Sequence, residues 1–309
     1  MSLLTEIPPE RLGWLRVIVS GYAFFHVWSR LGLYENIGRS PPEMFKGVGV
    51  TTLLDGALAP GTFMGLVYAC LALNLLFVLG WRTRVVGPLF SGLLLFVLTY
   101  RTSWVQIYHS DNLLALQALV LGLAPAAGDA ISLDARAGRA PSRERWEYAW
   151  PVLLMCGVTT LTYLIAGAAK VAGSAGWEWA LGSNLRDQIA YDALNKELLG
   201  LQPNEMAYWA YQHPMLMRPG SVGALMLELG APLALVHRRV GMVWAVSTWS
   251  MHWGIFYFMG IAFTYPMHGV AFVCFFPLER IAGGIGRGGR WLWSKVRRRP
   301  LSDSPLPAA

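Results

Sequence analysis

The sequence predicts an all-α integral membrane protein with about eight transmembrane helices and both termini in the cytoplasm. Three observations lead to this fold class: 55% of the 309 residues are hydrophobic, only 14% are charged, and the mean hydropathy is +0.42. Soluble domains carry about 25% charged residues. Because the deficit of charge extends along most of the chain, we exclude a soluble domain held by one anchor. The basic residues behind the net charge of +7 lie in short clusters between apolar runs, which favours membrane topology over nucleic-acid binding.

Eight apolar runs are candidate membrane spans, since a spanning helix needs about 20 mostly apolar residues. They are residues 12–31, 61–80, 85–100, 109–124, 147–170, 221–236, 240–260 and 265–280. The third, fourth and sixth runs are short, which leaves tilted or partly re-entrant segments open there. Pro232 could also kink the sixth run, because proline removes a helical hydrogen bond.

The Lys and Arg residues predict the orientation of the chain. With the N-terminus in the cytoplasm, 17 of the 25 Lys and Arg residues fall on the cytoplasmic side. Even the two shortest connections, 81–84 and 237–239, lie on that side and are basic. Cytoplasmic loops of membrane proteins carry such an excess of positive charge. We therefore expect a multi-pass protein with both termini in the cytoplasm and bilayer lipid as its main partner.

The sequence divides into a transmembrane domain, residues 1–280, and a tail, residues 281–309. Two long connections, 32–60 and 171–220, are expected to be extracytoplasmic loops. The tail is rich in glycine, then basic, then rich in proline. We expect this cytoplasmic tail to be mostly disordered, with the Arg297–Arg299 run resting on anionic lipid.

One short helix is expected within the second long loop. Asn184 and Asp187 have the spacing of a capping box, which predicts a helix over residues 185–199. Trp177 and Trp179, earlier in the same loop, suit an interfacial location.

Several motifs with known chemistry are not present in convincing form. Cys70, Cys156 and Cys274 each lie in an apolar run without metal-ligand spacing, so we interpret them as small buried side chains. The glycine-rich stretch 283–289 follows an apolar helix rather than a strand, which favours a flexible tail over a phosphate-binding loop. No metal site is predicted.

Lys170 is the first candidate for chemistry, because a charged residue in an apolar run needs a partner, a cavity or a function. On a helix, Thr159, Tyr163, Gly167 and Lys170 share one face that is polar or small. A lysine in an apolar pocket can act as a general base. The alternative is a lysine at a helix end that extends toward the membrane interface.

His109 is the second candidate, at the start of the fourth apolar run. Asn112 shares its helical face, and the predicted topology places His109 on the same, non-cytoplasmic, side as Lys170. The alternative is a helix-start cluster in which Ser110 or Asp111 caps the helix. The succession His-Ser-Asp is not in itself a catalytic triad, because a triad requires placement in three dimensions.

Three further polar residues lie inside apolar runs: Arg16, Glu228 and His252. Each could form an ion pair or hydrogen bond across helices, or take part in a functional site, and the sequence leaves both open. Tyr265 and His268 are weaker candidates near the last run.

Two segments together resemble a known family. The first runs from Tyr100 through Trp104 to His109 and on to Asn112; the second is Tyr-Leu-Ile-Ala-Gly-Ala-Ala-Lys at 163–170, with Trp177 after it. In residue type, order and separation they resemble the HTTM family, the horizontally transferred transmembrane domain shared with vitamin K-dependent gamma-glutamyl carboxylases. Arg16 and the helices of Glu228 and His252 also fit the family pattern. The resemblance covers residues 10–280 and implies an HTTM-like helical bundle.

The resemblance implies a reaction and a cofactor. In the carboxylases, the lysine that corresponds to Lys170 acts as the base on reduced vitamin K, and the histidine that corresponds to His109 assists. Reaction of the quinol with oxygen yields a strong base that removes a glutamate γ-proton, and carbon dioxide traps the carbanion. Supporting roles would fall to nearby polar and aromatic residues: Tyr163, Asn112, Trp104, Glu228, His252 and Arg16.

The sequence therefore predicts a carboxylase-like lyase that uses a reduced quinone of the vitamin K or menaquinol type, with its cavity open to the extracytoplasmic side. The acceptor could be a peptide or a small molecule. The carboxylases carry a large extramembrane C-terminal domain that has no counterpart here, which puts peptide carboxylation in question. Two alternatives stay open: a quinol-dependent oxidase or epoxidase without carboxylation, and a non-catalytic membrane scaffold or lipid-binding protein. A transporter is less favoured, because no internal repeat is visible.

Overall fold

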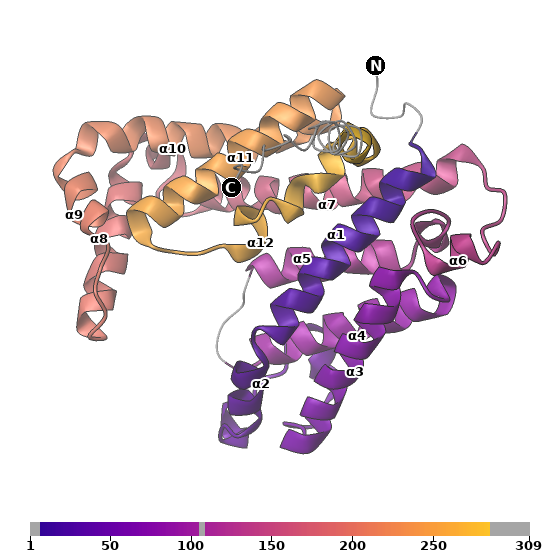
Figure 1. Ribbon diagram of the computed structural model, residues 1–309. Coiled ribbons are helices and arrows are strands. Elements are labelled where there is room, and N and C mark those ends of the chain that lie inside the picture. Colours follow the sequence, from indigo (N-terminus) through magenta and orange to yellow (C-terminus); the bar gives the residue numbers. More distant parts are fainter. Residues whose placement is uncertain (1–6, 105–108, 285–309) are drawn as a thin grey trace, which may run out of the picture.

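The computed structural model describes residues 7–104 and 109–284, and every regular element in these two ranges is a helix (Figure 1). The α-helices are α1 Pro9–Trp28, α2 Leu31–Gly38, α3 Pro60–Leu79, α4 Thr83–Thr102, α5 His109–Gly122, α6 Leu133–Arg136, α7 Arg145–Ala172, α8 Ser183–Leu198, α9 Glu205–Gln212, α10 Pro214–Leu229, α11 Arg238–Met259 and α12 Thr264–Met267. Short 3-10 helices connect them: η1 Pro42–Met44, η2 Gly49–Leu53, η3 Pro125–Gly128, η4 Gly176–Leu181, η5 Ala231–Leu235 and η6 Val270–Phe275. The predicted all-α class is confirmed for the described residues. The expectations for residues 285–309 of the tail lie outside them.

Among the residues that the structure describes, three helices, α3, α4 and α7, are long and apolar enough to cross a membrane. The apolar part of α5, Asp111–Gly122, is shorter. All three long helices expose large apolar side chains on their outer faces, among them Leu75, Leu89 and Leu161. A face of this kind is stable against lipid, whereas water would disfavour it. The number of spans and their sidedness remain predictions.

Helix α7 joins the two halves of the fold. In Figure 1, α1, α3, α4 and α5 pack together on one side, and α10 and α11 lie on the other. Helix α7 packs against α5 and α1 with one part of its surface and against α10 and η5 with another. One large apolar core runs through both halves. The face of α7 that points into this core therefore contacts residues that are far apart in the sequence.

The last apolar run does not form the expected helix. A continuous helix over 265–280 is wrong, because the chain forms α12 and then η6 and becomes α-helical again only at Leu278. Gly269 adopts a left-handed backbone with φ +76°, which ends the helical path between these two elements. Similarly, α10 ends at Leu229, and Pro232 lies in the 3-10 turn η5, where its missing N–H costs least.

The loop 171–220 forms a small helical unit of its own. The expected helix over 185–199 is confirmed as α8, and a small core of α8, α9 and α10 residues packs around Ile189. The predicted capping box is wrong. Gly182 precedes the helix with φ +90° and no side chain caps it, because the chain turns there directly against the backbone of Arg218.

Candidate functional site

The predicted polar face of α7 is the face that α7 buries. Thr159, Tyr163 and Gly167 are all buried, and Lys170 closes the face with its side chain 26% exposed. The spacing of these residues along the sequence thus predicted a real surface of the helix. What the sequence could not provide is the set of residues that this face meets.

Gly167 brings α10 close to α7. A Cβ at position 167 would lie 2.8 Å from the Cβ of Glu228 and 3.1 Å from the backbone nitrogen of Leu229. Real Cβ atoms do not approach other atoms so closely, and therefore only glycine allows this contact without a shift of one helix. Lys170 lies about one helical turn after Gly167 on the same face of α7, so the close approach at Gly167 brings Glu228 within reach of Lys170.

Lys170 and Glu228 form an ion pair. The Lys170 Nζ donates to both carboxylate oxygens of Glu228, at 2.6 Å to Oε2, and the Glu228 side chain is only 7% exposed. The same Nζ lies 5.1 Å from the centre of the Trp179 ring, in a cation–π contact. An acid and a base are thus in direct contact at a site that is largely closed to water.

A second polar pair lies deeper on the same face. The Tyr163 hydroxyl lies 3.4 Å from Nε2 of His252, and His252 Nδ1 lies 2.8 Å from the carbonyl oxygen of Thr248. Because Nδ1–H donates to that carbonyl, a neutral His252 has Nε2 as its acceptor for the Tyr163 hydroxyl. The indole N–H of Trp244 donates to the carbonyl of Leu227 at 2.9 Å, and this bond fixes α11 beside the Glu228 segment.

Gln117, a residue of α5, is a polar contact of this α7 face that was not predicted from the sequence. Its Nε2 donates to Thr159 Oγ1 at 2.8 Å and to the Ala271 carbonyl at 3.0 Å, and its Oε1 accepts from the Tyr265 hydroxyl. A glutamine in the middle of an apolar run was the available signal. The network ties α5, α7 and the segment after α12 together, which is a structural role.

His109 is the first residue of α5, and its side chain lies outside the described part of the chain. Helices α5 and α7 are antiparallel, because Gln117 contacts Thr159 while Asp129, beyond the end of α5, accepts from Tyr148 near the start of α7. The first residue of α5 and the last turn of α7 therefore lie at the same end of the helix pair. Asn112 is exposed.

Arg16 lies at the other end of the fold and binds backbone carbonyls. It is fully buried and donates to Ala127 O at 2.9 Å and to Ile131 O at 2.5 Å, and therefore it holds the loop between α5 and α6. The pairing of Arg16 with Glu228 or His252, which the sequence left open, is not formed. A Cβ at Gly80 would lie 2.6 Å from the Arg16 guanidinium, so the turn after α3 needs glycine here.

Trp104 packs against other aromatic side chains and has no recorded contact with Lys170 or Glu228. It is 6% exposed, and its ring lies 5.5 Å from Phe45 and 6.0 Å from Tyr100. This aromatic group closes the end of α4 against η1 and η2. The structure gives Trp104 a packing role.

A buried charge cluster joins the end of α4, the start of α5 and α1. Asp111 Oδ2 lies 2.6 Å from Arg101 Nη1, and Oδ1 lies 3.2 Å from His26 Nε2. All three side chains are less than one-tenth exposed. The sequence reasoning considered Asp111 only as a helix cap and did not select His26, although a histidine inside an apolar run was visible.

Within residues 7–104 and 109–284, no group of three or more His, Cys, Asp or Glu side chains could hold a metal ion. Comparison of the chain with protein-family models, with curated proteins and with solved structures finds no match. The geometry of the Lys170–Glu228 pair is therefore the basis for the functional argument. It provides one proton donor, one proton acceptor and an aromatic ring at a buried helix end.

Proposed function

We propose that this chain is a membrane-embedded enzyme of the HTTM type, in which Lys170 and Glu228 transfer protons to and from a reduced quinone in a carboxylase-like reaction. The observation that carries the proposal is the contact of Lys170 with both oxygens of Glu228 at the end of the polar face of α7. A bundle that crosses the membrane several times and an extracytoplasmic site are part of the same proposal. They are supported by the apolar surfaces of α3, α4 and α7 and by the distribution of Lys and Arg residues.

The residues at this helix end fit a reduced quinone in their donor set. Glu228 can hold the proton that Lys170 gives up, the Lys170 Nζ can then accept a hydroxyl proton, and the Trp179 ring offers a flat apolar surface. When bound, a reduced quinone supplies the acidic hydroxyl group and the electrons for reaction with oxygen. A bilayer delivers such an apolar molecule directly to a site between helices.

The proton chemistry of the pair follows from the direct contact of its two groups. As an ion pair, Lys170 is protonated and cannot act as a base. Transfer of one proton from Nζ to Glu228 makes both groups neutral. The Lys170 Nζ then holds a free electron pair that can accept a hydroxyl proton. Glu228 is thus the reservoir for the proton that Lys170 has to lose first.

A non-catalytic scaffold is the second candidate, and one observation favours it. Lys170 and Glu228 neutralise each other's charges, as expected of an ion pair whose only role is to hold α7 against α10. Removal of one partner of a buried ion pair lowers the free energy of unfolding by about 3–5 kcal/mol. A purely structural pair would therefore also be sensitive to mutation. The two functions therefore have to be separated by an activity measurement with a matched control.

The test is quinol-dependent oxygen uptake by the purified protein in lipid nanodiscs, with reduced menaquinone or vitamin K hydroquinone. The variant is Lys170→Ala, and the control is Lys196→Ala. Lys196 also pairs with a carboxylate, Asp192, and its side chain is similarly exposed, at 22%. We expect uptake by the wild type and the control, and a loss of at least about 100-fold in Lys170→Ala. Equal uptake in the two variants, or none in the wild type, would favour the scaffold.

A further inference from the structure

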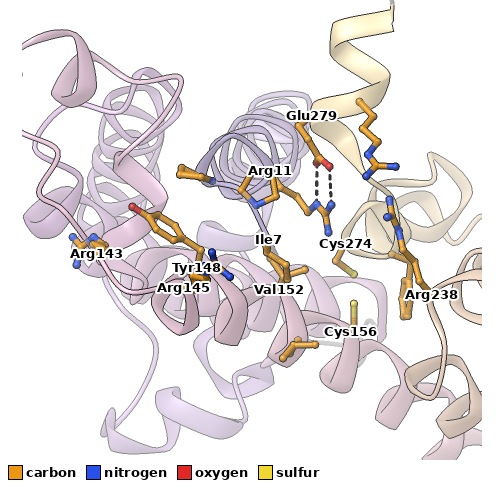
Figure 2. Close-up of a pocket in the computed structure, with 15 residues that line it drawn as sticks. Ile7, Arg11, Arg143, Arg145, Tyr148, Val152, Cys156, Arg238, Cys274 and Glu279 are labelled. Carbon is orange, nitrogen blue, oxygen red and sulfur yellow. Dashed lines mark hydrogen bonds and ion pairs between the residues drawn. The ribbon is translucent and has the colours of Figure 1, made fainter. Parts of the chain in front are cut away.

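A pocket of about 650 Å³ lies at the N-terminal end of α7, opposite to the Lys170–Glu228 pair (Figure 2). The start of α1, the first turns of α7, the start of α11 and the chain from η6 to Arg280 enclose it. Pockets that hold small organic ligands have volumes of about 300–1,000 Å³. The size is therefore sufficient for a headgroup and part of a chain.

The rim of this pocket is strongly basic. One carboxylate, Glu279, and five arginines line it: Arg11, Arg143, Arg145, Arg238 and Arg280. Glu279 is engaged by Arg11, which donates to it through Nε at 2.9 Å and through Nη2 at 2.7 Å. Arg143 pairs with Asp129 and Glu147, which lie outside the lining of the pocket.

The guanidinium groups of Arg238 and Arg280 form no hydrogen bond and no ion pair with a residue of 7–104 or 109–284. The backbone N–H of Arg280 donates to the Pro277 carbonyl. Arg238 also lies close enough to Arg11 and Arg280 for their positive charges to oppose its own, and Glu279 offsets part of this repulsion. Three arginines around one carboxylate leave an excess of positive charge, which favours the binding of an anion.

The floor of the pocket has the opposite character. It is formed by apolar and thiol side chains of α7 and η6, in particular Val152, Leu153, Cys156, Cys274 and Phe275. Cys156 and Cys274 face each other below the Arg11–Glu279 pair in Figure 2. An apolar floor below a cationic rim matches a molecule with an anionic head and a hydrocarbon chain.

We propose that this pocket binds an anionic phospholipid, with the headgroup phosphate at Arg238 and Arg280 and part of an acyl chain on the floor. The distribution of Lys and Arg assigns this end of α7 to the cytoplasm, and cytoplasmic leaflets are rich in anionic lipid. Basic pockets between helices on that side bind such headgroups. The proposal rests on the membrane placement proposed above and is independent of the chemistry at Lys170.

The test measures binding of phosphatidylglycerol to the full-length protein in neutral mixed micelles, by native mass spectrometry. The variant is the double substitution Arg238→Ala with Arg280→Ala. The control is Arg84→Ala with Arg239→Ala, which removes two arginines of the same predicted side that do not line the pocket. Phosphatidylcholine and glycerol phosphate are the comparison ligands, because they lack the net charge and the acyl chains, respectively.

We expect phosphatidylglycerol to bind the wild type and the control equally, and the pocket variant about 30-fold more weakly. Equal binding to the pocket variant and the control would overturn the proposal. Binding of glycerol phosphate as tight as that of phosphatidylglycerol would also overturn it, since the acyl chain would then contribute nothing. Circular dichroism of each variant verifies folding. The assay contains no quinol, so its failure is distinct from a failure of the proposed reaction.

Discussion

The two ends of α7 differ in the balance of positive and negative side chains around them. At the C-terminal end, one cation, Lys170, meets one carboxylate, Glu228, and the charges cancel. At the N-terminal end, about 38 Å away along the helix, five arginines and a single carboxylate line one pocket. A balanced buried pair can move a proton between its members, whereas an unbalanced rim can only attract an anion from outside. One helix thus carries a candidate site for chemistry and a candidate site for anchoring.

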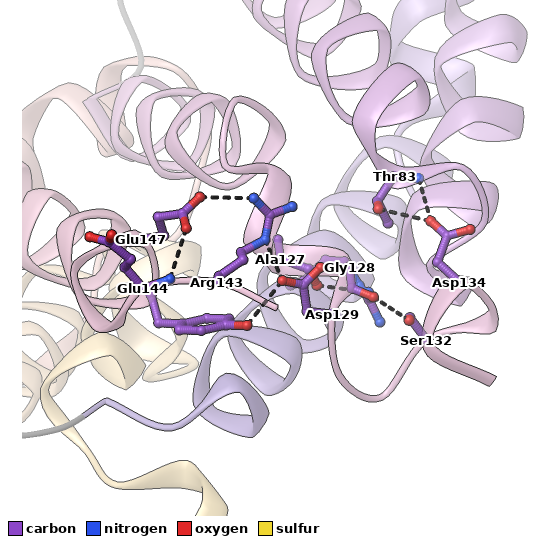
Figure 3. Close-up of polar contacts among 11 residues, drawn as sticks. Thr83, Ala127, Gly128, Asp129, Ser132, Asp134, Arg143, Glu144 and Glu147 are labelled. Atoms are coloured by element: carbon purple, nitrogen blue, oxygen red, sulfur yellow. Dashed lines mark hydrogen bonds and ion pairs between the residues drawn. The ribbon is translucent and has the colours of Figure 1, made fainter. Parts of the chain in front are cut away.

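The polar surroundings of the two ends also differ. Next to the pocket, the loop between α5 and α7 is fixed by several side chains: Arg143 donates to Asp129, Thr83 donates to Asp134, and Ser132 donates to Gly128 O (Figure 3). At the Lys170 end, the polar contact between α7 and α10 is one ion pair, next to the close approach at Gly167. We therefore expect single substitutions to disturb function most at the Lys170 end.

The largest effect is expected from Glu228→Gln. The amide cannot take up the Lys170 proton, so quinol-dependent oxygen uptake should fall by about 10²- to 10⁴-fold. Asp192→Asn is the control, because Asp192 also pairs with a lysine, Lys196, although its side chain is 23% exposed against 7% for Glu228. Uptake at the wild-type rate in Glu228→Gln would show that the pair takes no part in proton transfer.

The next largest effect concerns the buried Asp111 cluster, the other balanced charge group on the Lys170 side. Asp111→Asn removes the carboxylate that Arg101 and His26 share, and the unfolding free energy should fall by about 3 kcal/mol. Thermal or denaturant unfolding in detergent measures this change. Asp187→Asn serves as control, because the Asp187 side chain is 66% exposed. A loss no larger than that of the control would mean that the cluster contributes little to stability.

Gly167→Ala tests the close approach of α7 and α10. The added Cβ would clash with Glu228, which should cost about 1–3 kcal/mol and lower the oxygen uptake with it. Gly157→Ala is a matched control on the same helix, since a Cβ there meets no atom within 4 Å. The melting temperature and the uptake rate of the two variants are compared. Equal behaviour would mean that helix contact does not set the geometry of the pair.

The smallest effect is a pH dependence at the pocket end. Burial alone would raise the pKa of Asp134, but hydrogen bonds from Thr83, Arg82 and Arg139 outweigh it and lower the pKa below 3.8. A carboxylate with a lowered folded-state pKa adds stability above its unfolded value, and this stability is lost as the pH falls through the folded value. Unfolding of the wild type should therefore become easier below about pH 4. Asp134→Asn should be less stable at neutral pH and show less of this acid dependence; an identical acid profile would contradict the assignment.

The sequence predicted those features of the fold that depend only on residues close together in the chain. The spacing from Thr159 to Lys170 predicted the buried face of α7, because helical period is a property of neighbouring residues. The partner of Lys170 could not be predicted, since Glu228 is 58 residues away and reaches it only because of Gly167. Apolar composition alone also failed at 265–280, because it does not distinguish a helix from the 3-10 turn that follows Gly269.

The basic residues show the same limit of prediction from local sequence pattern. Their positions predicted which side of the membrane each connection occupies, and Arg11, Arg143 and Arg238 all fell on one side. Their convergence on one pocket depends on how α1, α7 and α11 meet, which no local pattern encodes. Arg16 was a candidate for a functional pair, yet its partners are backbone carbonyls, which carry no signal in the sequence.

The most direct test of the central claim is the charge-swapped variant Lys170→Glu with Glu228→Lys, measured for melting temperature and for oxygen uptake with reduced menaquinone. The swap rebuilds an ion pair between α7 and α10 but moves the amine to the other helix. The account predicts a melting temperature above that of either single variant and an uptake at least about 100-fold below that of the wild type. Recovery of wild-type uptake in the swapped protein, or absence of quinol-dependent uptake in the wild type, would contradict acid–base chemistry at Lys170.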